Sequence, residues 1–322
     1  MTINSPEVEN SGIVVIGAAN IDIKGKPKNA IQWGTSNPGD IRISHGGVAR
    51  NIAHYLGLLN IPVTFLGAVG DDEEGREILE KLRNAHVQVK EVILSKKDPT
   101  GKYLAILDEK GEMQLAVSDT VIMKRVTPRY LIAKAGIIMK NRFVIIDTNL
   151  TTQAIHNIAS LCSREKIPLI VDPVSMVKSR KLLGILPKIH FLTPNISELS
   201  ALAGIAIKNS AERQRAVEQL MKKGVKNIIL TNSAQGVYIF SEHSPEGEFI
   251  NTWRRKIVDS TGGGDALVAG MAYGLYHNYQ LYQAVQIGLL ISSLAVTSPD
   301  SVYSQIDEMM IKKQIVRMFK IL

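Results

Sequence analysis

The residues best suited to chemistry in this sequence lie in one short segment, Asp259-Ser-Thr-Gly-Gly-Gly-Asp265. A helical apolar pattern follows it, so we predict that Gly262, Gly263 and Gly264 form the turn into a helix, capped by Thr261. Bare N–H groups at a helix N-terminus favour a bound anion. A carboxylate at Asp265 could take a proton from a hydroxyl group while these N–H groups stabilise a transferring phosphoryl group. The segment therefore predicts phosphoryl transfer with Asp265 as the general base.

Two better-known glycine motifs do not fit this segment. A dinucleotide-binding G-x-G-x-x-G that starts at Gly262 requires glycine where Leu267 stands, and a Walker A loop requires Lys and then Ser or Thr where Asp265-Ala266 follow. One alternative without chemistry stays open for the segment taken alone. Asp265 could simply be an acid favoured by the helix dipole, after glycines that only turn the chain.

The rest of the chain predicts an α/β fold around this segment. Short apolar strands alternate with helical patterns, which is typical of a parallel sheet covered by helices on both faces. The predicted strands are Ile13–Gly17, Val63–Val69, Phe143–Asp147, Pro168–Val171, Ile189–Thr193 and Asn227–Leu230; the predicted helices include Val48–Leu59, Glu73–Ala85, Gly263–His277, Leu281–Val296 and Tyr303–Phe319.

Two segments do not follow this alternation. Residues 24–44 are rich in Gly and Pro, and residues 98–119 contain a predicted hairpin of Tyr103–Leu107 and Met113–Val117. We expect the two segments to pair into a small β-sheet that covers one edge of the main domain. Residues 1–322 are thus predicted to form a single domain that carries this small sheet as an insertion.

Composition narrows the range of functions. The 322 residues carry a formal charge of +8, but the basic residues are scattered and only 5% of residues are aromatic. We therefore expect no nucleic-acid partner and attribute the charge to a solvated surface that also favours a nucleotide polyphosphate. The N-terminus lacks the apolar core of a signal peptide, and the longest nearly apolar run, Ile287–Val296, is about half a membrane span. With Cys162 as the single cysteine, the sequence predicts a cytoplasmic protein without a membrane partner.

The glycine segment resembles the C-terminal signature of the pfkB (ribokinase-like) kinases, D-T-x-G-A-G-D, with Gly263 in place of alanine. Four further motifs follow the family order: N-x-D at Asn20–Asp22, G-G-x-x-x-N-x-A from Gly46-Gly47 through Asn51, G-x-V-G-x-D-x-x-G at 67–75, and N-x-x-E at Asn195–Glu198. The resemblance covers about residues 13–302. It implies a ribokinase-like three-layer α/β/α domain with a mostly parallel sheet, in which the small sheet is a lid over the substrate.

The resemblance also implies the activity and the roles of the residues. It implies an ATP- and Mg²⁺-dependent kinase of a hydroxymethyl group, the 5′-hydroxyl of a nucleoside. The softer features at 36–39, 46–51, 171–175 and 297–300 are most similar to those of pseudouridine kinases. The implied substrate-binding residues are Asn20, Asp22, Gly46, Gly47, Asn51 and Asn149. On the nucleotide side they are Asn195, Thr231, Gly236 and Glu198, with Glu198 placing Mg²⁺ through water. Relatives bind K⁺ at the positions of Asp259 and Thr261.

Several alternatives stay open. Asn20 and Asp22 could be ordinary turn formers, and Asn195 a helix cap with Glu198 in the first turn. Ser233 replaces a family glycine, and Leu289 replaces a polar adenine contact of several relatives. The substrate could instead be another nucleoside or a sugar such as ribose or fructose. A catalytically silent sensor is a further alternative, against which the retention of Asp265 and Glu198 argues.

The lid is where we expect the nucleoside base to bind. Asn37, Thr100, Tyr103 and Asp119 are the polar lid residues most able to reach it, and Asp119 is the candidate acceptor for the extra ring N–H of pseudouridine. An acceptor aimed at that N–H would discriminate against uridine. Asp119 could equally be a solvated turn residue. An exposed strand edge of the lid could also pair with a second copy of the chain in a homodimer.

Overall fold

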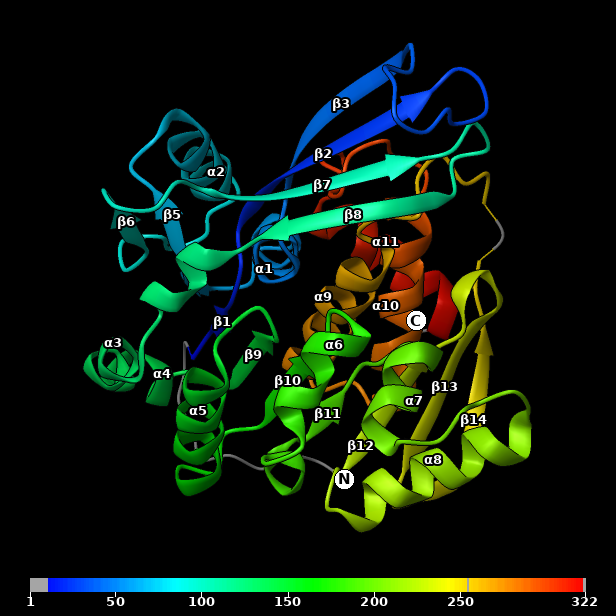
Figure 1. Cartoon of the computed structure of the whole chain (residues 1–322). Helices are drawn as coiled ribbons and strands as arrows, with labels where there is room; N and C mark the ends of the chain where they lie inside the picture. Colours follow the sequence, from blue (N-terminus) through cyan, green and yellow to red (C-terminus); the bar gives the residue numbers. More distant parts are fainter. Residues whose placement is uncertain (1–10, 254, 321–322) are drawn as a thin grey trace.

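A computed structural model describes residues 11–253 and 255–320 of the chain (Figure 1). Its central sheet has eight strands in the order β14-β13-β12-β11-β10-β9-β1-β4. Neighbours from β4 to β12 run parallel, whereas β13 and β14 are antiparallel additions. The strands are β1 (Ile13–Ile16), β4 (Val63–Leu66), β9 (Phe143–Asp147), β10 (Leu169–Asp172), β11 (Phe191–Leu192), β12 (Asn227–Thr231), β13 (Gly236–Ser241) and β14 (Ser244–Asn251). The predicted α/β class with a mostly parallel sheet is confirmed.

Helices cover both faces of this sheet. Along β1, Ile13 and Val15 pack into one apolar cluster while Val14 and Ile16 pack into another, as the strand alternation requires. Helices α1 (Val48–Leu58), α2 (Glu73–Asn84), α9 (Gly263–Tyr276), α10 (Leu281–Ala295) and α11 (Glu308–Phe319) contribute to the first cluster; α3 (Pro128–Ala133), α4 (Ala135–Met139), α5 (Thr152–Arg164), α7 (Ile196–Ala203) and α8 (Ser210–Lys222) contribute to the second. The result is the expected three-layer arrangement.

Helix α9 is almost completely buried, and small residues make this possible. A Cβ on Gly270 would lie 2.7 Å from the Cα of Gly288 in α10, and a Cβ on Gly274 would lie 2.6 Å from the Cα of Ala284. The two helices therefore pack with their backbones in near contact. This packing fixes the N-terminus of α9, where Asp265 lies.

The two irregular segments form a second sheet of four strands in the order β3-β2-β7-β8, at the top of Figure 1. We call it the lid. Its strands are β2 (Asn20–Pro27), β3 (Gly39–Gly46), β7 (Gly101–Leu107) and β8 (Met113–Asp119). Strand β2 follows β1 closely and pairs with β7 in parallel, although α1, β4 and α2 separate the two in sequence. The lid thus joins segments that lie far apart in the chain.

The two faces of the lid differ in polarity. The strand registers place Asp22, Lys24 and Tyr103 on one face, which we call the inner face. The opposite, outer face carries a group of apolar side chains that are each more than a third exposed: Ile41, Ile43, Leu104, Leu115 and Val117.

Two predicted elements have different bounds in the structure. The strand predicted at Val63–Val69 is divided at Gly67 into β4 and β5 (Ala68–Gly70), and β5 pairs with β6 (Ile93–Ser95). The final helix begins at Glu308 and not at Tyr303, because the Asp307 side chain caps it by accepting a hydrogen bond from the Met310 N–H at 2.8 Å. A short helix, α6 (Met176–Ser179), was not predicted.

Two further predictions concern membranes and export. Among the residues that the structure describes, no helix has the length and apolar character needed to cross a bilayer. The N-terminal residues on which the signal-peptide prediction rests lie outside the described part of the chain.

Candidate active site

Asp265 lies in the first turn of α9 and is 91% buried, with 9% of its surface exposed. Its Oδ2 accepts a hydrogen bond of 2.6 Å from the Asn51 side-chain amide on α1. Burial raises the pKa of Asp265 to about 7, against the opposing effect of the Asn51 hydrogen bond. A carboxylate with this pKa can accept a proton near neutral pH. The Asn51 side-chain oxygen is buried and has no hydrogen-bond partner among the described residues, so it can accept from a ligand.

The glycines before Asp265 have different physical roles. Gly262 has φ +81°, and a Cβ there would lie 2.2 Å from the Ser301 carbonyl oxygen. The fold therefore requires glycine at 262. A Cβ on Gly263 would meet Val296 at 3.2 Å, whereas a Cβ on Gly264 would meet nothing within 4 Å. The packing of the chain does not require glycine at 264, and the open space beside its bare backbone suits an approaching anion.

Asp22 and Asn20 lie on the lid strand β2, not in a turn as the alternative reading had it. Asn20 donates a 2.6 Å hydrogen bond to Asp22 Oδ1, and both side chains are buried. A Cβ on Gly46 would lie 2.1 Å from Asp22 Oδ1, so glycine at 46 makes room for this carboxylate. Gly47, with φ +98°, lets α1 begin close to Ala18. Tyr103 lies beside Asp22 on the inner face of the lid.

Arg50 is a charged residue of the site to which we assigned no role from the sequence. Its side chain is 2% exposed, and its Nε donates to the Gly46 carbonyl at 3.1 Å. Its positive charge lowers the pKa of Asp22 and of Asp265, although burial outweighs this effect at both carboxyls. Nη2 of Arg50 has no hydrogen-bond partner among the described residues. Arg50 is thus the buried counter-charge of the two acids.

Asn149 is held in place by two buried or partly buried charged residues. Its N–H donates to Asp147 Oδ1 at 2.8 Å, and its side-chain oxygen accepts from Lys178 Nζ at 2.6 Å. The other oxygen of Asp147 accepts from the N–H groups of Ala18 and Ala49, so this carboxylate joins β9, the end of β1 and the start of α1. Burial lowers the pKa of Lys178. Neither Asp147 nor Lys178 was singled out from the sequence.

The nucleotide-side residues come from neighbouring strand ends. Asn195 and Glu198 form a reciprocal cap of α7, with 2.9 Å for each hydrogen bond, and Thr231 forms a β-bridge with Asn195. Gly236 has φ +139°, and a Cβ there would lie 2.0 Å from the Ile250 carbonyl oxygen. Ser233 has φ +50°, so it adopts the left-handed conformation that glycine adopts most easily.

Asp172 is an acid whose pKa is affected by other acids of the site. Burial raises the pKa of Asp172 well above its ordinary value, and the charges of Asp265 and Glu198 raise it further. Burial also raises the pKa of Glu198. Such an excess of negative charge suits a divalent cation. No group of three or more His, Cys, Asp or Glu side chains able to hold a metal ion occurs within residues 11–253 and 255–320, so Mg²⁺ would rely on water and phosphate oxygens here.

Asp259 and Thr261, predicted as a site for a monovalent cation, contact a lysine of the lid. Lys24 Nζ lies 2.6 Å from Asp259 Oδ2 and 2.5 Å from Thr261 Oγ1. The position is therefore next to an ammonium group of the protein itself. No contact of this kind was expected from the sequence.

Three of the predicted lid residues are not brought to the site. Asp119 pairs with Lys102, which places its side chain on the face of the lid opposite to Asp22 and Tyr103. It is exposed and accepts a hydrogen bond from the Val121 N–H, as a turn residue does. Thr100 is buried and bonded to Asp72, and Asn37 is exposed and bonds within its own loop. This placement argues against Asp119 as the reader of the base.

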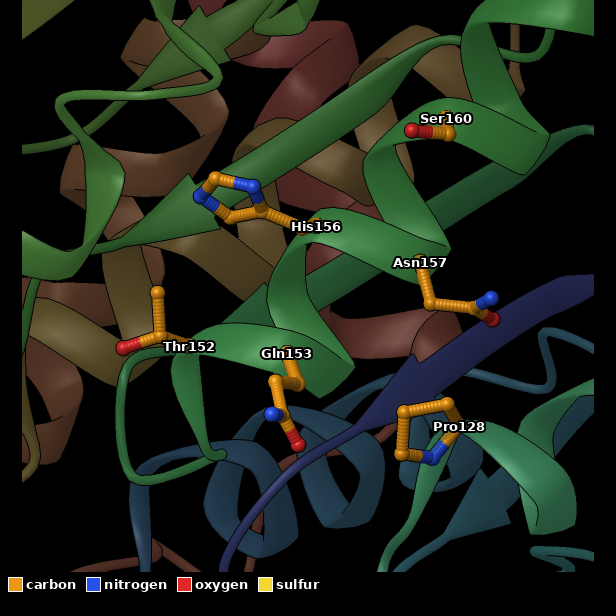
Figure 2. Close-up of a pocket in the computed structure, with 6 residues that line it drawn as sticks. All are labelled: Pro128, Thr152, Gln153, His156, Asn157 and Ser160. Atoms are coloured by element: carbon orange, nitrogen blue, oxygen red, sulfur yellow. The ribbon is translucent and has the colours of Figure 1, made fainter.

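A separate hollow lies along α5 (Figure 2). It is lined by Pro128, Thr152, Gln153, His156, Asn157 and Ser160. Helix α5 packs on the opposite face of the central sheet from α9. None of the predicted site residues lines this hollow, so it is not part of the candidate active site.

Comparisons with known proteins bear on the family and the fold of the chain. The family model described as pfkB family carbohydrate kinase matches residues 10–308. The pseudouridine kinase of Escherichia coli (strain K12) is 32% identical over 289 residues, which cover 90% of this chain and 91% of that protein. The guanosine-inosine kinase of Exiguobacterium acetylicum is 25% identical, with 90% and 95% covered. The structure of Arabidopsis thaliana ribokinase complexed with ribose and ATP matches with a TM-score of 0.83 at 22% identity, with 95% and 99% covered.

Proposed function

The chain belongs to the pfkB family of carbohydrate kinases and is a phosphotransferase with an alcohol group as acceptor, and we propose that it phosphorylates the 5′-hydroxyl of a nucleoside, pseudouridine, with ATP. The observation that carries the proposal is the buried Asp265 at the start of α9, bonded to Asn51 and next to the open backbone of Gly264. A proton acceptor and an anion site are adjacent there. The identity to pseudouridine kinase supports the choice of substrate.

In the proposed reaction Asp265 accepts the proton of the 5′-hydroxyl group. The hydroxyl oxygen forms a bond to the γ-phosphorus while the bond between the γ-phosphorus and the bridging β,γ-oxygen breaks, which releases ADP. The N–H groups at the start of α9, beyond Gly262, bind the phosphoryl oxygens as charge develops on them. Asp22 and Asn20 bind the ribose hydroxyls, and the free oxygen of Asn51 accepts from the sugar. Asp265 therefore holds the proton at the end of the transfer.

The nucleotide binds, in this proposal, at the ends of β11 and β12. Asn195 and Thr231 lie side by side there, and Gly236 turns the following hairpin. Mg²⁺, when bound, neutralises charge on the transferring phosphates. Glu198 and Asp172 are the carboxylates whose raised pKa values fit such a cation. Asn149 and Lys178, a paired amide and ammonium, follow β9 and β10, the strands between β1 and β11 in the sheet.

We further propose that the protein forms a homodimer through the outer face of the lid. The apolar group Ile41, Ile43, Leu104, Leu115 and Val117 is exposed there, and an apolar face of one subunit can cover the same face of a second copy. Size-exclusion chromatography with light scattering should give twice the chain mass for the wild type and the chain mass for the double variant Ile43→Glu, Val117→Glu. A monomeric wild type would contradict the proposal.

A substrate panel tests the proposed activity. ADP formation is measured with pseudouridine, uridine, inosine, guanosine, ribose and fructose, each at several concentrations with MgATP. We expect the largest kcat/KM for pseudouridine. A pseudouridine to uridine ratio near one would contradict this substrate, a preference for inosine or guanosine would assign a purine nucleoside, and no turnover with any acceptor would favour a sensor.

A further inference from the structure

Lys24 connects the lid to the loop that leads into the glycine turn. It stands two positions after Asp22 on β2, so both side chains lie on the inner face of the lid. Its Nζ donates to Asp259 Oδ2 at 2.6 Å and to Thr261 Oγ1 at 2.5 Å. These residues are 235 and 237 positions away in the chain. The ammonium group of this lid residue thus holds the loop 259–261, which lies directly before the glycine turn.

Apart from this ammonium, the loop is attached by backbone hydrogen bonds from the Val258 and Asp259 N–H groups to the Val296 carbonyl, at 2.8 and 3.3 Å. Ile257 and Val258, directly before it, are each more than half exposed, so apolar packing does not hold the loop. Asp259 Oδ1 accepts from the Thr261 N–H at 2.8 Å, and its other oxygen accepts from Lys24. The carboxylate therefore shapes the loop with one oxygen and attaches it to the lid with the other. Gly262 follows immediately.

A second cation of the lid contacts the loop that contains Asp300 and Ser301, after α10. Arg42 lies opposite Lys24 in the β2–β3 pairing, and its Nη2 is 3.6 Å from Asp300 Oδ1. The Ser301 carbonyl of that loop lies against Gly262. Both partners of the Arg42 pair are about half exposed or more, so we expect this pair to contribute little. The Lys24 pair is more buried, with 17% and 23% of the two side chains exposed.

We propose that Lys24 is a positioning residue that serves as the built-in cation of the loop 259–261 and so orders the glycine turn from the lid. This inference rests on the proposed kinase function and extends it. Because the same strand carries Asp22 and Lys24, the strand that binds the acceptor also aligns the loop that binds the phosphoryl group. A protein with its own ammonium here needs no free monovalent cation for turnover.

Chemical rescue tests this role. The wild type, Lys24→Ala, Lys24→Met and the control Lys26→Met are assayed for kcat/KM in tetramethylammonium chloride, and again with added KCl or methylammonium chloride. Lys26 lies on the same strand and face but is exposed and makes no ion pair among the described residues. We expect wild type and Lys26→Met to be insensitive to the salt. Both Lys24 variants should lose about tenfold or more, and K⁺ or methylammonium should restore Lys24→Ala but not Lys24→Met, whose side chain fills the space.

Hydrogen exchange supplies a readout that needs no substrate. In the full-length protein without ligands, the amides of residues 260–265 should exchange faster in both Lys24 variants than in the wild type, and not in Lys26→Met. Unchanged exchange would overturn the inference, as would a wild type that requires K⁺, a Lys24→Ala variant with wild-type kcat/KM, or one that no cation rescues. A wild type without kinase activity would instead refute the proposed function, and the exchange experiment would still decide the role of Lys24 in ordering the loop.

Discussion

Replacing Asp265 by Asn separates the catalytic role of this residue from its cost to the fold. The change is nearly isosteric, and the new side-chain oxygen can still accept the hydrogen bond from Asn51. The variant loses the proton acceptor, for which a general base typically contributes about 10²–10⁴-fold in rate. We therefore expect normal folding and binding of both substrates with that loss of kcat.

The same substitution should also change how stability depends on pH. Burial raises the pKa of Asp265 to about 7, while the unfolded chain titrates this group near its ordinary 3.8. Above pH 3.8 the folded wild type binds a proton that the unfolded chain does not, so its stability falls as pH rises until pH passes about 7. Between pH 5 and pH 8 the titration of Asp265 extends over roughly two pH units, from pH 5 to about 7, and lowers the free energy of unfolding by about 3 kcal/mol. The Asn variant has no such titration.

Urea unfolding of wild type and Asp265→Asn at pH 5 and pH 8 measures this difference. From pH 5 to pH 8 the free energy of unfolding of the variant should rise by up to about 3 kcal/mol relative to that of the wild type. The control substitution Asp40→Asn, at an exposed position of the lid, should show no such relative rise. An equal difference at both pH values would show that the pKa of Asp265 is not raised. A variant with near wild-type kcat would remove Asp265 from the role of base.

Three other predictions concern the same site. Asp22→Ala should raise the Michaelis constant for the nucleoside far more than that for ATP, by the equivalent of about 1.5–3 kcal/mol per lost charged hydrogen bond; equal rises in both would indicate damage to the fold. Arg50→Met removes the counter-charge of Asp265, so the pKa of Asp265 should rise. The acidic limb of the pH profile of kcat/KM should then move to higher pH, and an unmoved limb would contradict the role assigned to Arg50. Gly262→Ala should destabilise the fold by about 1–3 kcal/mol in thermal unfolding. Gly264→Ala should leave the stability equal or slightly raised. It should nevertheless reduce turnover about tenfold or more, because the new Cβ enters the space assigned to the phosphoryl group. A fully active Gly264→Ala would refute that assignment.

Much of the fold follows from local patterns in the sequence. Apolar strands that alternate with helices predict the parallel sheet, and the Gly-rich segments that interrupt the alternation predict the lid. The motif residues Asn51 and Asp265 meet although they are 214 positions apart, because each stands at the start of a helix beside the same end of the sheet. The break at Gly67 was not predicted, since the apolar run Val63–Val69 continues through it.

The placement of Asp119 depends on a detail that local sequence does not reveal. The β7–β8 pairing shifts by one residue between Ile106 and Leu107, and a shift of one residue moves every side chain to the other face of a strand. Lys24, by contrast, could have been predicted to share a face with Asp22 from the spacing of two in a strand. Arg50 could not, because a basic residue in a helical pattern is ordinarily solvated, and here the lid and α9 bury it.

The parallel pairing of β2 with β7 has a consequence for the order of folding. Strand β2 can pair with β3, the next strand in the chain, but its other partner, β7, comes only after α1, β4 and α2. Asp265 can reach its place in the site only when α9 has formed, and α9 lies near the end of the described chain. Contacts this distant in sequence close large loops and form slowly. We therefore expect an emerging nascent chain to acquire its sheet first and its catalytic competence among the last events of folding.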